Sequence, residues 1–188
     1  MSRTSYDWWA GVLMTPGKLE DWLKRQYHSE ASAVNRIGKL KEKAEAVGVR
    51  EGIEGSNWYE WEALLKMISD DEAKHAGQVA KLMLMRGLEP KILTEHRSKY
   101  FSKFQENMDT SVLGMTAVAA YAELTSLTRF QAIMAHPETP IDIRNEFKTI
   151  LFEEEFHYAA FRRLAGDAAM ERAKFRHQQG LQAVQIEA

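Results

Sequence analysis

The sequence contains Glu72-Ala73-Lys74-His75 and, much later, Glu154-Glu155-Phe156-His157, and these two stretches decide the fold. Each follows the pattern Glu-x-x-His, and each lies in the middle of a long segment with helical periodicity. Residues three apart lie on the same face of a helix, so each segment directs one carboxylate and one imidazole to the same point. Two such faces, brought together, predict a site for two metal ions.

Both patterns interrupt apolar stripes that predict buried helix faces. One helix is expected from about Trp58 to Arg86, where Gly87 and Pro90 end it, and another between Pro140 and Gly166. The first stripe consists of Trp61, Leu65, Ile68, Glu72, His75, Val79 and Leu82, and the second of Ile143, Phe147, Ile150, Glu154, His157, Phe161 and Leu164. In each, the polar residues occupy positions where the pattern expects core.

Two further helices each place one acid on an apolar stripe. A helix from about Thr15-Pro16 to before Gly48 carries Glu30, and one from about Thr110 to Ala135 carries Glu123, its single acidic residue. A carboxylate is costly to bury without a partner, so Glu30 either binds something or the stripe is drawn in the wrong register. The competing interpretation is a plain bundle with solvated acids. The expected stripes are Leu19, Leu23, Tyr27, Glu30, Val34, Ile37 and Leu40, and Leu113, Thr116, Ala120, Glu123, Leu127, Phe130 and Met134.

These segments predict an all-α fold, an antiparallel four-helix bundle in a single domain over 1–188. The bundle core is expected at about 18–165, and 166–188 reads as a peripheral C-terminal helix and tail. A short loop makes the first two helices antiparallel neighbours. The longer connection from 88 to 110 is predicted to cross the bundle between helices 2 and 3, with a short helix at about 95–105.

The composition fits one compact domain and excludes several classes of site. The chain has 188 residues, 45% hydrophobic and 28% charged, with a net charge of −2, so bulk charge does not favour nucleic-acid binding. It has no cysteine, which excludes disulfides, iron–sulfur clusters and a built-in rubredoxin-like centre. We therefore expect a separate electron donor.

The N-terminal segment shows no targeting signal. Its most apolar run, Trp8 to Met14, is short and lacks a small-residue cleavage pattern. No segment approaches the roughly 20 consecutive apolar residues of a membrane span. The prediction is a cytoplasmic protein with no membrane partner.

An acidic residue directly precedes the glutamate of each Glu-x-x-His pattern, and each is a candidate partner for a metal-bound histidine. Metal-bound histidines usually donate their second ring N–H to an acceptor that fixes the tautomer. We pair Asp71 with His157 and Glu153 with His75 as a hypothesis, with solvated acids as the alternative. The remaining histidines, His28, His96, His136 and His177, lie off the stripes and are interpreted as surface or loop residues.

The four segments, from about Leu19 to Leu164, resemble the ferritin-like superfamily, especially its di-iron carboxylate oxidase and oxygenase branch, which is rubrerythrin-like or tRNA-hydroxylase-like. The resemblance implies two iron ions, with manganese or a mixed iron/manganese pair as alternatives. It also implies that Glu72 and Glu154 bridge the two ions. The implied metal ligands are Glu30, Glu72, His75, Glu123, Glu154 and His157.

The resemblance implies an oxygen-activating oxidoreductase, a hydroxylase, oxygenase or oxidase. Its expected partners are dioxygen or peroxide, a small-molecule or modified-nucleoside substrate and the separate electron donor, and a homodimer is one option for its assembly. The alternatives are a ferroxidase that handles iron, a rubrerythrin-like peroxidase, and a scaffold that keeps its metals for stability. No residue beyond the ligands is assigned as an acid or base.

Overall fold

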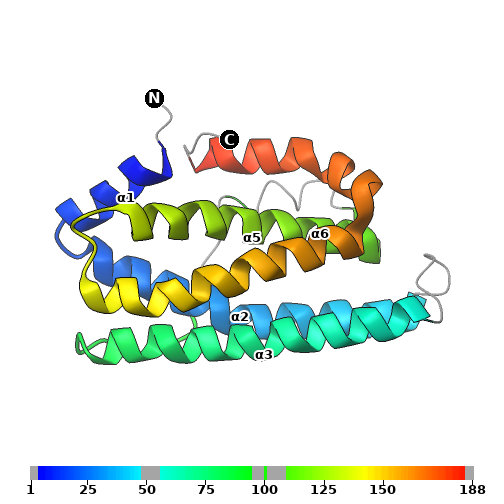
Figure 1. Ribbon diagram of the computed structural model, residues 1–188, viewed down its shortest axis with the longest axis horizontal. Helices are drawn as coiled ribbons and strands as arrows, with labels where there is room; N and C mark the ends of the chain where they lie inside the picture. Colours follow the sequence, from blue (N-terminus) through cyan, green and yellow to red (C-terminus); the bar gives the residue numbers. More distant parts are fainter. Residues whose placement is uncertain (1–3, 48–55, 95–99, 101–108, 185–188) are drawn as a thin grey trace.

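The structure is a computed structural model that describes residues 4–47, 56–94, 100 and 109–184 (Figure 1). These residues form helices and no strand. The helices are α1 (Ser5–Met14), α2 (Lys18–Val47), α3 (Ser56–Leu84), α5 (Val112–Ala135) and α6 (Ile141–Ala183). The predicted all-α four-helix bundle is confirmed.

The four long helices form two antiparallel pairs, α2 with α3 and α5 with α6, that pack side by side (Figure 1). Helices α3 and α5 run in the same direction, so the end of α3 and the start of α5 lie at opposite ends of the bundle (Figure 1). The predicted short helix at 95–105 lies outside the described residues except for Tyr100, which is helical and buried.

The two Glu-x-x-His stripes are buried along their whole length, as the sequence predicts. The stripe of α2 is partly wrong. Leu19, Tyr27 and Val34 are only half-buried, whereas Trp22 and Ala33 lie in the core. The physical reason is a packing partner outside the bundle, because Trp22 contacts α1.

Helix α1 covers one end of the bundle and was not predicted from the sequence. A capping box between Thr4 and Asp7 begins it. Trp9 is fully buried, its indole Nε1 donates a 2.7 Å hydrogen bond to Thr139, and its ring lies 4.8 Å from Trp22 in an edge-on contact. Helix α1 is therefore held by tertiary contacts to residues far along the chain.

Helix α6 turns at Gly166, and its C-terminal part folds back over α5 (Figure 1). Gly166 has φ 72° and ψ 160°, a conformation that is essentially restricted to glycine. The returning segment buries His177, whose Nδ1 lies 2.6 Å from the Tyr100 hydroxyl. The prediction that His177 is a surface or loop residue is wrong, because it lies in this helical segment and its ring is buried against Tyr121. His136 lies in the loop after α5, as predicted, but it is buried and its ring contacts Tyr6 of α1. No helix in the described ranges is long and apolar enough to cross a membrane.

Candidate metal centre

The six predicted ligands converge on one place in the middle of the bundle, with at least one from each of the four long helices. All are nearly fully buried except Glu123, which is half-buried. Six ionisable side chains in an apolar interior require a compensating charge. They are Glu30 from α2, Glu72 and His75 from α3, Glu123 from α5, and Glu154 and His157 from α6.

The ligand atoms divide into two overlapping groups. One comprises Glu30, Glu72, His75 and Glu154, and the other Glu72, Glu123, Glu154 and His157, and within each group the atoms lie within 4.8 Å of one another. Glu72 and Glu154 belong to both. Each group has one histidine and one glutamate of its own, so the arrangement is that of two equivalent half-sites that share two carboxylates.

The spacing within each half-site suits a metal ion and not a hydrogen bond. His75 Nδ1 lies 3.8 Å from Glu30 Oε2 and 3.7 Å from Glu154 Oε1, and His157 Nδ1 lies 3.5 Å from Glu72 Oε1 and from Glu154 Oε2. Two ligand atoms that are each about 2.1 Å from a divalent ion lie roughly 3.0–3.7 Å apart at bond angles of 90–120°. The donor atoms therefore surround gaps of ionic size.

Unpaired polar atoms mark the same two gaps. Within the described part of the chain, His75 Nδ1, His157 Nδ1 and Glu154 Oε2 are buried without a hydrogen-bond partner. A buried polar atom without a partner costs about 1–3 kcal/mol, so native structures rarely contain three in one place. All three face the gaps, and mixed imidazole and carboxylate ligands suit iron or manganese. The residues present fit a dinuclear metal centre.

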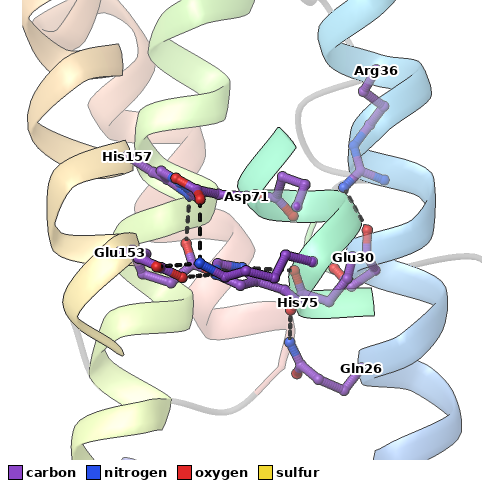
Figure 2. Close-up of polar contacts among 11 residues, drawn as sticks. Gln26, Glu30, Arg36, Asp71, His75, Glu153 and His157 are labelled. Atoms are coloured by element: carbon purple, nitrogen blue, oxygen red, sulfur yellow. Dashed lines mark hydrogen bonds and ion pairs between the residues drawn. The ribbon is translucent and has the colours of Figure 1, made fainter. Parts of the chain in front are cut away.

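The outer nitrogen of each histidine meets a carboxylate from the opposite helix (Figure 2). His75 Nε2 lies 2.8 Å from Glu153 Oε2, and His157 Nε2 lies 3.4 Å from Asp71 Oδ2. These are the contacts expected from the sequence. An N–H held at Nε2 leaves the Nδ1 lone pair free to face the gap, which is the tautomer that metal binding requires.

A comparison with family models supports the same conclusion. The model of the rubrerythrin family matches residues 21–165, the part of the chain that carries all six ligand positions. This chain belongs to the rubrerythrin family. Comparisons with curated proteins and with solved structures yield no match. As a rubrerythrin-family protein, it is a ferritin-like protein, and its cluster of Glu and His side chains fits a dinuclear metal site. Helix α1 and the segment after Gly166 lie outside the family match.

The rubrerythrin-type centre is strongly perturbed electrostatically. Burial, followed by neighbouring carboxylates, raises the pKa of Glu72 and of Glu154 well above its usual value, and burial also raises the pKa of Glu123. For Glu30, burial is outweighed by the nearby His75 imidazole and by polar contacts that include the hydrogen bond from Gln26, so its pKa is lowered. The shared carboxyls therefore hold their protons to a higher pH than an exposed glutamate does, and metal ions would displace those protons.

The pKa values of the two histidines are shifted in opposite directions. Burial is outweighed at His75 by its contact with Glu30, which raises the pKa of that imidazole, whereas burial and the neighbouring His75 lower the pKa of His157. A neutral imidazole is the form that binds a metal ion. The His157 half-site is therefore the better prepared of the two before metal binds.

Polar residues around the centre that were not predicted from the sequence include Gln26, Lys74 and Arg36, whose charge partly offsets the rise in the pKa of Glu72 and of Glu123. Gln26 donates a hydrogen bond to Glu30 from one turn earlier in α2 (Figure 2), and Lys74 forms ion pairs with both Glu153 and Asp71. The spacing of Gln26 and Glu30, four residues apart on one helix, was a readable signal. Lys74 looked like an ordinary solvated lysine, because its main partner lies 79 residues away.

Proposed function

We propose that this protein is a di-iron oxidoreductase that activates dioxygen, as an oxidase or oxygenase, with electrons from a separate donor. The observation that carries the proposal is the pair of complete half-sites, each with its own histidine and glutamate and both sharing Glu72 and Glu154. Two iron ions held there would supply the redox chemistry. The family match supports iron as the metal.

The protein's own contribution is to hold, orient and shield the ligands. Glu30 with His75 and Glu123 with His157 would each help to hold one ion, and Glu72 and Glu154, which belong to both groups, would help to hold both. Carboxylates on rigid helices keep these positions without a reorganisation cost during the reaction. Because His75 and His157 are fully buried, water has little access to their side of the centre.

Glu123 is the least buried of the six ligand residues, although its carboxyl group lies inside the bundle. Five of the six ligands are almost fully buried, and Glu123 on α5 is the exception. Its neighbours along α5 include Ala119, Ala120 and Ala122, whose side chains are small. We assign the α5 side of the centre as the access side for dioxygen and for a small-molecule or nucleoside substrate.

The family match favours a second candidate, the reduction of peroxide. Rubrerythrin-type proteins use oxygen or peroxide together with electron donors. The same ligand set serves either oxidant, so the two candidates differ in the rate with each oxidant and not in the residues that hold the metals.

The test loads the protein with two equivalents of iron(II) without oxygen and then mixes it with dioxygen or with hydrogen peroxide. Rapid oxidation by dioxygen, followed by repeated turnover when a reductant is supplied, supports the oxidase or oxygenase. Oxidation at least about a hundredfold faster with peroxide supports the peroxidase. Glu155→Gln, which changes the exposed acid beside Glu154, is the matched control. Oxidation by each reagent that is no faster than the oxidation of iron(II) in buffer by that same reagent would overturn the proposal.

A further inference from the structure

Lys74 connects the two histidines of the centre through a continuous chain of polar contacts. Its ammonium group contacts Oε1 of Glu153 and lies 3.4 Å from Oδ1 of Asp71. Each of these carboxylates uses its other oxygen for a histidine, Oε2 of Glu153 for His75 and Oδ2 of Asp71 for His157. One cation thus lies behind both imidazoles.

Because Lys74 and a histidine contact different oxygens of the same carboxylate, the orientation of each carboxylate is fixed. A carboxylate with one contact can rotate about its terminal bond, whereas one held at both oxygens has a defined plane. The side chains of Asp71 and Glu153 are 23% and 19% exposed, so water competes for them unless another group occupies their outer oxygens. Lys74 occupies both outer oxygens from the solvent side, where it is 45% exposed.

We infer that Lys74 is a positioning residue that orients both histidine ligands at once, through Glu153 and Asp71. The inference rests on the proposed metal centre. Because Glu153 lies 2.8 Å from His75 whereas Asp71 lies 3.4 Å from His157, removal of Lys74 affects the His75 half-site more than the His157 half-site. The expected consequence is a coupled weakening of both metal positions by a substitution that touches neither.

The chain contains a matched pair of residues for separating this role from ordinary helix packing. Lys81 lies two turns after Lys74 on α3, and Glu146 lies two turns before Glu153 on α6, and these two residues form the same kind of interhelical ion pair. Glu146 is 18% exposed, close to the 19% of Glu153. The other oxygen of Glu146 accepts a 3.3 Å hydrogen bond from Gln78, whereas the corresponding oxygen of Glu153 contacts a histidine.

The experiment compares Lys74→Met, Lys74→Arg and Lys81→Met with the parent protein, with cobalt(II) as the probe. Cobalt affinity is measured by competition with a chelator. The exchange rates of the two histidine Nε2 protons are measured from their shifted NMR signals in the cobalt-loaded protein. Stability of the metal-free protein is measured by urea unfolding.

Loss of a group that contacts a metal-bound histidine typically costs 10–100-fold in affinity, so a group one step further out is expected to cost about 3–10-fold. Lys74→Met should show this loss together with faster proton exchange, above all at His75. Lys74→Arg should restore most of both, since it keeps a cation with several donors. Lys81→Met should leave both unchanged while it lowers stability as much as Lys74→Met.

Equal behaviour of Lys74→Met and Lys81→Met in cobalt affinity and proton exchange would overturn the positioning role. That result differs from failure of the metal centre itself. If the parent protein binds no cobalt, the proposed function fails first, whatever the variants do.

Discussion

Replacement of Glu154 by glutamine is expected to stabilise the metal-free protein while it abolishes tight binding of metal. Glu154 is 1% exposed, and its Oε2 has no hydrogen-bond partner in the described ranges. A residue selected for packing would be satisfied by its neighbours. A buried carboxylate that binds a cation destabilises the fold when the cation is absent, so its replacement should raise the free energy of unfolding of the metal-free protein.

The size of the effect follows from the ionisation of Glu154. Burial, and then the nearby Glu123 and Glu72, raise its pKa well above the usual 4.5. The folded state therefore binds this proton more tightly than the unfolded state, and stability is lost as pH rises above 4.5. At pH 7 the loss for one carboxyl is at most about 3 kcal/mol, from about 1.36 kcal/mol per pH unit. Because neighbouring carboxyls share the proton, we expect glutamine to recover about 1–3 kcal/mol.

The assay is urea unfolding with a chelator present, at pH 5 and pH 7.5, for the parent, Glu154→Gln and the control Glu155→Gln. The gain should be larger at pH 7.5 than at pH 5, and Glu155→Gln should show almost none, because Glu155 is exposed. A loss of about 3–5 kcal/mol for Glu154→Gln, the typical cost of breaking a satisfied buried pair, would refute the reasoning.

Three further predictions concern the surroundings of the centre. Asp71→Ala and Glu153→Ala should each weaken metal binding about 10–100-fold in a chelator competition without unfolding the metal-free protein, and unchanged affinity would remove their orienting role. Gly166→Ala should cost about 1–3 kcal/mol in urea unfolding, because an added Cβ meets no atom within 4 Å and only the backbone is strained. A cost below about 0.5 kcal/mol would mean that the turn relaxes. Burial lowers the pKa of His177 to about 4, so the folded state binds this proton less tightly, and stability should fall by up to about 3 kcal/mol as pH falls from 6.5 to 4. His177→Gln should flatten that part of the pH profile, and an unchanged slope would contradict the assignment.

The sequence predicted those parts of the fold in which apolar residues recur at helical spacing and form one buried face. Glu72 and His75 on α3, and Glu154 and His157 on α6, lie on stripes whose other members are all large and apolar. The structure buries these stripes in the predicted register. The paired positions of Asp71 and Glu153 could also be expected, because a helix places the residue before a ligand toward the neighbouring helix.

What the sequence could not show depends on contacts between distant parts of the chain. Helix α1 is nearly apolar around much of its circumference and becomes a packed helix only through partners such as Thr139, 130 residues from Trp9. Its contact with Trp22 also explains the error in the α2 stripe. Lys74 is informative only once α6 lies beside it. In each case the missing information was the identity of the neighbour and not the preference of the residue.

The most direct test of the central claim is the number of iron ions that the folded protein retains. Iron(II) is added without oxygen, excess is removed, and iron per chain is determined by elemental analysis for the parent and for Glu123→Ala, which removes the one acid of α5. The account predicts about two iron ions per parent chain and fewer in the variant. Retention of none by correctly folded protein, or of many ions per chain with no effect of Glu123→Ala, would contradict it.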